Sequence, residues 1–455
     1  MVTPLVASAI LNPINSTLIA VALVPIGQSF GAGPGRTAWL ISALYLATAV
    51  GQPVVGLLVD RFGARQVLLT GAAVVMAAGF AGMFPISIEW LIGVRVVLGV
   101  GTCAGFPAAM AALRHHAEAT GQGVPAKVLA VLSISSQTIM VIGPTLGGVL
   151  IALFGWPAIF AVNLPLAAVS LVLAWRWVPK DRRTARAEPA PVDLAGIALF
   201  SLLLLALLFY VMDPGVGDLW LVGAVLALGA AFTAVELRAR TPFLDLRMLA
   251  AHPAILRTYL RQALSFLVIY AIMFGYVQWL ETSRGLGESA AGAMLLPMSV
   301  VAVAAAAASG RTTGVRLRLV LTAVALTVGS ALLLLVDRGT WIVALAGLAA
   351  VFGLAQGLTS VTNQTTLYRE APAEQMGTAS GLFRSAQYLG AIVASTLIAR
   401  CFGAHASSAG LHQLGWALLV VSLVLVAVTV FDRSLRTPPP RADTDSGAHD
   451  GPRDA

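Results

Sequence analysis

Residues 56–69 read GLLVDRFGARQVLL and join two apolar runs, 38–58 and 67–85. Each run has the length of roughly 20 apolar residues that crosses a bilayer. The glycines of the joining stretch permit a tight turn and close approach of the backbone. Its aspartate can pair with an arginine or cap a helix N-terminus, and its arginines hold the stretch at the membrane surface. We interpret the stretch as a latch that forms in one conformation and breaks in another, with an ordinary basic loop as the alternative. The latch candidates are Gly56, Asp60, Arg61, Gly63 and Arg65.

The rest of the chain is equally apolar. Of its 455 residues, 58% are hydrophobic and 11% are charged, whereas soluble domains average about 25% charged residues. A soluble protein cannot cover so much apolar surface without associating. We therefore predict an all-α membrane protein with about 14 spans. The runs cover roughly 5–27, 38–58, 67–85, 90–112, 128–152, 157–177, 194–212, 217–235, 259–280, 289–309, 317–336, 341–365, 375–402 and 412–432.

The net charge of +8 is compatible with nucleic-acid binding, but the basic residues lie between the apolar runs. If the N-terminus is inside, almost all lysines and arginines fall on the inner side, as the positive-inside rule requires. The exceptions on the outer side are Arg36, Arg284, Arg338 and Arg400. This bias predicts an even number of spans, cytoplasmic N- and C-termini and no nucleic-acid partner. Lys127 and Lys180 are the only lysines, which is typical of a GC-rich bacterial genome, so we expect a bacterial inner-membrane location.

The charged links divide the chain into four predicted parts. Residues 1–178 hold a first six-helix bundle, and residues 179–256 hold a linker and two extra spans. Residues 257–433 hold a second six-helix bundle. The tail, 434–455, is rich in Pro, Arg and Asp and lacks apolar periodicity, so we expect it to be disordered and cytoplasmic.

The fourth run contains a charge at Arg95, in the sequence RVVLGVG. An arginine inside a span is costly and usually faces a cavity or a partner. Gly99 and Gly101 next to it allow tight contact between helices. A structural ion pair, or a side chain that reaches back to the membrane surface, is the alternative.

The fifth run contains IGPTLGGVL, residues 142–150. Its proline removes a backbone donor and kinks the helix, and its glycines form a small-residue face for close packing. These features predict a hinge or a seal rather than a ligand site, with a glycine-rich packing helix as the alternative. The residues concerned are Gly143, Pro144, Gly147 and Gly148.

These three stretches resemble motifs of the major facilitator superfamily, namely G-x-L-a-D-r-x-G-r-k, R-x-x-q-G-x-G and G-P-x-x-G-G. Ala64 and Leu98 depart from the first two patterns. Stretches 154–167, 236–249, 276–297 and 377–390, with the central pair of spans, resemble its fourteen-helix drug/proton antiporter family.

The resemblance implies a fold of two six-helix bundles plus two central helices, and alternating access about a midplane site. It also implies a proton-coupling role for Arg95. G-P-x-x-G-G is associated with exporters, so export is implied rather than import.

The first run departs from the family, because Asn15 stands where the family has an acid. Asparagine can neither carry a proton nor balance a cation. No Asp or Glu lies near the middle of any other run, which favours a neutral or anionic substrate. Polar residues that can line a cavity, or instead form helix–helix hydrogen bonds of about 0.6 kcal/mol, are Asn12, Asn15, Gln137, Tyr270, Gln278, Gln356 and Gln387.

No motif indicates an enzyme, a metal site or a cofactor. The chain has no GxxxxGK[ST] loop for ATP, and Cys103 and Cys401 have no CxxC partner. The sequence predicts a monomeric, proton-coupled exporter of a small amphipathic drug, antibiotic or secondary metabolite. An importer or dedicated metabolite carrier of the same fold, a membrane-embedded enzyme and a transport-dead receptor are the alternatives.

Overall fold

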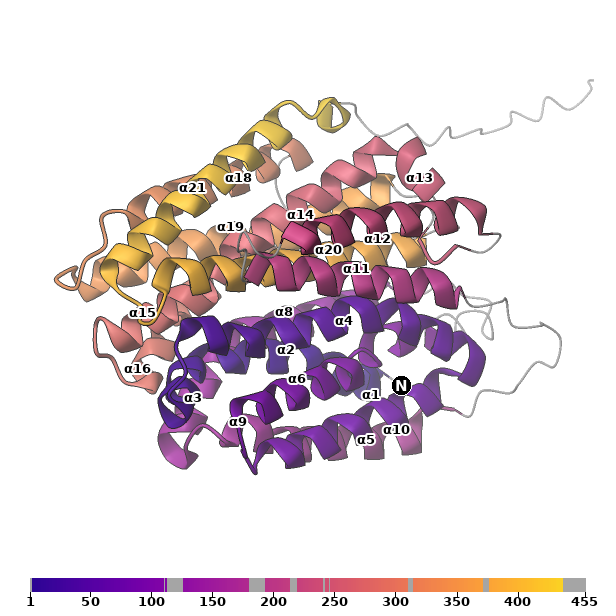
Figure 1. The fold of residues 1–455 in the computed structure, drawn as a ribbon, viewed down its shortest axis with the longest axis horizontal. Coiled ribbons are helices and arrows are strands. Elements are labelled where there is room, and N and C mark those ends of the chain that lie inside the picture. The colour runs from indigo at the N-terminus through magenta and orange to yellow at the C-terminus, as the bar shows by residue number, and fades with distance from the viewer. Residues whose placement is uncertain are drawn as a thin grey trace, which may run out of the picture.

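The computed structural model describes residues 2–109, 111–112, 126–179, 193–212, 219–239, 242–244, 246–309, 314–370 and 376–436. These residues form helices joined by short turns, and no strand occurs among them (Figure 1). The all-α fold class is therefore confirmed. The predicted tail lies outside the described residues beyond residue 436.

The part of the chain before residue 178 forms long helices joined by turns at both ends. Gly63 alone separates two of them, and its φ of 87° is a conformation that glycine adopts without strain. The tight turn predicted at Gly63 is thus confirmed. The elements are α1 (Val2–Ala9), α2 (Leu11–Leu18), η1 (Ile19–Val21), α3 (Leu23–Phe30), α4 (Pro34–Phe62), α5 (Ala64–Gly82), α6 (Ile88–Thr102), α8 (Ala126–Phe154), α9 (Ala158–Ala161) and α10 (Asn163–Trp177).

The described residues from 193 onward also form mostly helices. A π-type turn, η3, widens the helix between α14 and α15, which is a distortion often found at functional sites. The elements are α11 (Leu194–Met212), α12 (Leu219–Arg238), α13 (Leu246–Ala251), α14 (Pro253–Ala271), η3 (Ile272–Tyr276), α15 (Val277–Thr282), α16 (Glu288–Ala293), α17 (Leu296–Ala308), α18 (Val315–Leu333), α19 (Ile342–Glu370), α20 (Met376–Phe402), α21 (Ser408–Val430) and η5 (Arg433–Arg436).

The helices have the length and surface of membrane spans. In the described part of the chain, 11 helices are long and apolar enough to cross a membrane, and two shorter apolar helices accompany them. Large apolar side chains face outward, such as Leu226 at 69% exposed and Val420 at 59% exposed, a surface that suits lipid rather than water. Each predicted run overlaps one or more of the helices given above. The count of 14 crossings stays a prediction.

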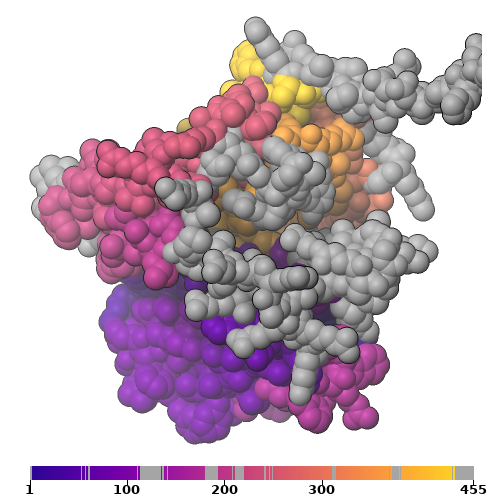
Figure 2. All heavy atoms as spheres, turned by 90° about the vertical axis from the view of Figure 1, so that its right-hand side faces the viewer, coloured from indigo at the N-terminus to yellow at the C-terminus, as the bar shows by residue number. Residues whose placement is uncertain are grey.

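The helices gather into two groups that meet along the middle of the molecule. Figure 1 shows the helices up to α10 on one side and α14 and α18–α21 on the other, with α16 beside the end of the first group. The groups meet where α4 packs on α20 and where α8 packs on α16 and α17. α11 and α12 pair with each other, and α11 touches both α4 and α20. Figure 2 shows the region of α11–α13 protruding at one side of the two groups. We keep the predicted bundles, 1–178 and 257–433, as a proposal.

Candidate functional site

The structure describes only part of the predicted latch. Arg65 donates a hydrogen bond to the main-chain carbonyl of Trp175, which ties the start of α5 to the end of α10. A Cβ atom added to Gly56 would meet no atom within 4 Å, so close approach does not require glycine there in this conformation. The side chains of Asp60 and Arg61 lie outside the described residues, and the latch remains a proposal.

Arg95 is buried in the first group, with 2% of its surface exposed. Its Nε donates to the carbonyl of Leu40 at 2.9 Å, and its Nη1 donates to the carbonyl of Asn15 at 2.7 Å. Nη2 is buried with no partner. No carboxylate among the described residues pairs with this guanidinium. The charge is therefore held by main-chain dipoles of two other helices, which leaves the nitrogen Nη2 for a further group.

Asn15 and Asn12 lie one turn apart but have different partners. The amide of Asn15 exchanges hydrogen bonds of 2.6 Å and 3.0 Å with Asn163 of α10, inside the first group. Asn12 donates to Thr102 at 3.0 Å and accepts from Tyr388 of α20 at 3.2 Å. Asn12 thus lies at the interface of the two groups, while Asn15 forms the helix–helix pair that was the alternative to a cavity role.

Three tyrosines fill the middle of the interface, and we call Tyr45, Tyr270 and Tyr388 the tyrosine cluster. The ring of Tyr45 lies 5.1 Å from that of Tyr270 and 5.5 Å from that of Tyr388. Phe274 stacks on Tyr270 at 5.7 Å. All three tyrosines are at most 3% exposed. Such rings offer flat apolar faces and hydroxyl groups at one place.

Amide side chains from both groups of helices surround the tyrosine cluster. Gln387 donates to the hydroxyl of Tyr270 at 3.2 Å and accepts from Gln262 at 3.2 Å. Asn363 donates to Gln262 at 3.1 Å, and Gln52 of α4 donates to Tyr388 at 3.3 Å. Two predicted residues, Tyr270 and Gln387, are thus brought together. Gln262 and the tyrosines of α4 and α20 were missed, because an aromatic or amide in an apolar run looks like core.

The other predicted cavity residues lie elsewhere. Gln278 lines a cleft of about 460 Å³ between α3, α15 and residues 404–406, at the end that the charge bias predicts to be outer. Gln356 is buried in α19, with 4% of its surface exposed. The side chain of Gln137 lies outside the described residues. Near the opposite end, the guanidinium of Arg384 lies 4.1 Å from the ring centre of Phe106, a cation–π contact between the two groups.

The glycines of the fifth run pack against two different partners. A Cβ on Gly147 would come within 3.0 Å of the Leu18 carbonyl, and one on Gly143 would overlap the hydroxyl of Thr17. Both therefore hold α8 against the first span. A Cβ on Gly148 would instead come within 2.6 Å of the carbonyl of Glu288 in α16.

Hydrogen bonds strengthen this second contact. Ser289 donates to the carbonyl of Gly148 at 3.0 Å, and Thr145 donates to that of Gly292 at 3.1 Å. We call this α8–α16 contact the outer seal, because it lies at the end that the charge bias predicts to be outer. The helix α8 passes through it with Pro144 inside. The roles of the four motif residues stay a proposal.

Comparison with known proteins gives a consistent result. The model of the family described as "Major Facilitator Superfamily" matches residues 5–395. The chain is 29% identical over 425 residues to the uncharacterized MFS-type transporter YwoD of Bacillus subtilis. That match covers 92% of this chain and 93% of YwoD. It is 30% identical over 402 residues to the tetracenomycin C resistance and export protein of Streptomyces glaucescens, covering 85% and 72%. The crystal structure of a mutant of the peptide transporter POT covers 94% of both chains with a TM-score of 0.65 and 16% identity, which shows the fold alone.

Proposed function

Since the chain belongs to the Major Facilitator Superfamily, we propose that it exports a small neutral or anionic amphipathic compound, driven by protons. It is a multi-pass membrane transporter, and the members of this family are transporters rather than enzymes. Relatives described by resistance or export, such as the tetracenomycin C protein, support the direction. They also support a bacterial inner-membrane location. Their differing named compounds do not identify the substrate.

The tyrosine cluster carries this proposal. It lies where the two groups of helices meet, which is where alternating access places a substrate. Its rings can stack on a flat apolar compound, and its hydroxyl and amide neighbours can donate to polar atoms of that compound. Among the described residues, the charged groups that act on these tyrosines are Arg95 and Arg384. A cation would therefore lack a counter-ion there, whereas a neutral or anionic compound would not.

The outer seal supports alternating access. In this conformation α8 and α16 close one end of the interface through main-chain contacts that only glycine permits. Rocking of the proposed bundles apart at this end would break the seal and expose the tyrosine cluster to the outer side. Rocking in the other sense would expose it to the cytoplasm.

Proton coupling without the family acid needs another route. The unpartnered Nη2 of Arg95 and the Asn15–Asn163 pair next to it are polar groups that can hold a water or a substrate oxygen. We propose that Arg95 takes part in coupling through such a group, because an arginine does not itself release a proton at physiological pH.

Accumulation in a bacterial host that lacks its own efflux pumps tests the proposal. The chain is expressed, and the host is loaded with neutral, anionic and cationic antibiotics or dyes, with and without an uncoupler. We expect lower accumulation of a neutral or anionic compound, abolished by the uncoupler. Tyr388→Phe serves as a matched variant, because it removes only one hydroxyl from the cluster.

An importer or dedicated metabolite carrier is the second candidate. Arg95 without a carboxylate, and Arg384 near the inner end, suit uptake of an anion. Raised accumulation of an anionic compound would establish it. Lower accumulation of a cation alone would contradict the proposed substrate class.

A further inference from the structure

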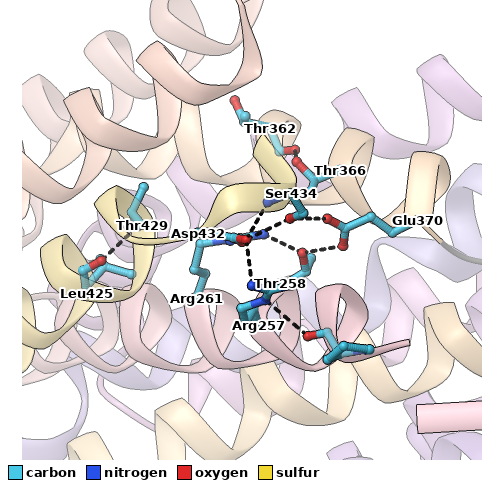
Figure 3. A network of polar contacts seen from close by, with 11 residues as sticks. Arg257, Thr258, Arg261, Thr362, Thr366, Glu370, Leu425, Thr429, Asp432 and Ser434 are labelled. Atoms are coloured by element: carbon cyan, nitrogen blue, oxygen red, sulfur yellow. Dashed lines mark hydrogen bonds and ion pairs between the residues drawn. The ribbon is translucent and has the colours of Figure 1, made fainter. Parts of the chain in front are cut away.

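The carboxylate of Asp432, at the end of the molecule predicted to be inner, is buried with a full set of donors (Figure 3). Asp432 follows α21 and is 1% exposed, and it pairs with Arg261 of α14, which is also 1% exposed. Arg257, one turn earlier, pairs with the same carboxylate at 3.0 Å. The main-chain N–H of Ser434 donates to it at 3.0 Å. Each oxygen of this buried acid therefore has a donor, so the acid can remain ionised.

Glu281 of α15 lies near the end predicted to be outer, and it is held in the opposite way. Both of its carboxylate oxygens are buried, and neither takes part in a hydrogen bond. Among the described residues it is the only acid with both oxygens buried and unpartnered. Arg284 follows three residues later, but no ion pair between described residues joins it to Glu281. An ionised carboxylate here would have lost its water and gained no donor in exchange.

The elements around α15 do not compensate a negative charge on this acid. In the described part of the chain α15 packs against η1, α3, η3 and α16. η1 and α3 contain no titratable residue, and η3 contributes Tyr276, which is neutral at physiological pH. α16 contributes Glu288, whose negative charge acts on Glu281, and His405 lines the cleft that Gln278 lines one turn before Glu281. A buried, unpaired and repelled charge is strongly disfavoured.

The position of Glu281 connects it with the outer seal. Its charged neighbour Glu288 is the residue whose main-chain carbonyl lies against Gly148 of α8. The next residue, Ser289, donates to the carbonyl of Gly148 at 3.0 Å. Separation of α16 from α8 would therefore change the surroundings of Glu281 and admit water to it.

We propose that Glu281 is a proton-binding site, and that it holds its proton while the outer seal is closed. The proton comes from water on the outer side and binds to one carboxylate oxygen, which leaves a neutral acid in the buried site. When the seal opens, the proton returns to water and the carboxylate is hydrated. Proton binding and closure of the seal are therefore linked, so a low pH on the outer side favours the closed end. This link rests on the alternating access proposed above, whereas proton binding itself does not.

Infrared spectroscopy of the purified full chain tests proton binding without any transport. The pH is raised from about 4.3, where an ordinary glutamate is half-ionised, and the C=O band of protonated carboxyl groups is followed. We expect a band that persists above this pH in the wild type and is weaker by one carboxyl group in Glu281→Gln. Glu89→Gln, in an exposed outer acid, is the matched control and should keep the whole band. A wild-type spectrum without the band, or a Glu281→Gln spectrum that retains all of it, overturns the proposal.

Amide hydrogen exchange of α16 tests the link to the seal. Over the pH range in which the open form has released the proton and the sealed form still holds it, one linked proton raises the ratio of open to sealed molecules about tenfold per pH unit. The protection of the α16 amides should fall by that factor in the wild type and should not depend on pH in Glu281→Gln. The same pH dependence in both proteins contradicts the link.

Glu281→Leu separates a neutral acid from an ionised one that has a structural role. Because the leucine is uncharged and apolar, it should keep the seal closed at every pH, as Glu281→Gln should. If Glu281→Leu instead exposes α16 at every pH, an ionised carboxylate holds the seal, and the proposal is overturned. Loss of transport would change neither the infrared band nor the exchange, so failure of the proposed function is recognised separately.

Discussion

The outer seal makes a quantitative prediction for Gly148→Ala. The added Cβ would lie 2.6 Å from the main-chain carbonyl oxygen of Glu288 and 3.0 Å from the Cα of Ser289, where ordinary contact begins at 3.4 Å. The carbonyl cannot rotate away, so α16 must move outward by about 0.8 Å, the difference between 3.4 and 2.6 Å. Overpacking of this kind costs about 1–3 kcal/mol. Because only the sealed conformation bears this cost, the ratio of open to sealed molecules should rise by about 5- to 150-fold.

Spin labels at the ends of the two groups that are predicted to be outer measure the ratio of open to sealed molecules. Phe84→Cys and Trp341→Cys place labels at exposed positions, 57% and 81% exposed, in a background with Cys103→Ala and Cys401→Ala. Double electron–electron resonance should show a longer distance gaining population in Gly148→Ala. Gly93→Ala is the matched control, since its Cβ meets nothing within 4 Å. If both variants give the same distance distribution, the α8–α16 contact is not a seal between conformations.

Three further predictions concern the interface, the buried Arg95 and the end predicted to be inner. Tyr388→Phe loses hydrogen bonds to Asn12 and Gln52, each worth about 0.6 kcal/mol, so the KM for export should rise several-fold while the unfolding temperature changes little. Arg95→Gln should abolish uncoupler-sensitive export with the protein still in the membrane; retained export would exclude a coupling role. Asp432→Asn should lower stability by about 3–5 kcal/mol, because it leaves buried Arg261 without its counter-ion; thermal unfolding measures the loss. Burial raises the pKa of Asp432, but hydrogen bonds from Ser434 and Arg261 outweigh burial and lower the pKa from its ordinary value of 3.8. The stability that the ionised Asp432 contributes should therefore be present above pH 3.8 and lost as the pH falls through the folded-state pKa. A difference in stability between the wild type and Asp432→Asn that does not depend on pH would contradict this.

Much of the fold could be predicted because the apolar runs of a membrane helix are long and continuous. The turn at Gly63 was also predictable, since only a glycine tolerates that φ between two helices. The distortion at η3 was not, because nothing in the apolar sequence of residues 272–276 marks a wider turn.

The site was less predictable, because its partners come from distant parts of the chain. The sequence predicts that the glycines of the fifth run pack closely, but it does not show that Gly148 faces α16 while Gly147 faces the first span. Asn12 and Asn15 are both asparagines and lie on the same helix face. Their different partners, Tyr388 and Asn163, follow only from how the helices pack.

Reconstituted transport tests the central claim most directly. The purified protein is placed in liposomes with the compound found by the accumulation assay, and a pH gradient is imposed while movement of the compound and of protons is recorded. The account predicts that the compound moves against its concentration gradient, with protons moving in the opposite direction. Equilibration of the compound that ignores the pH gradient, with no proton movement, would contradict proton-driven export.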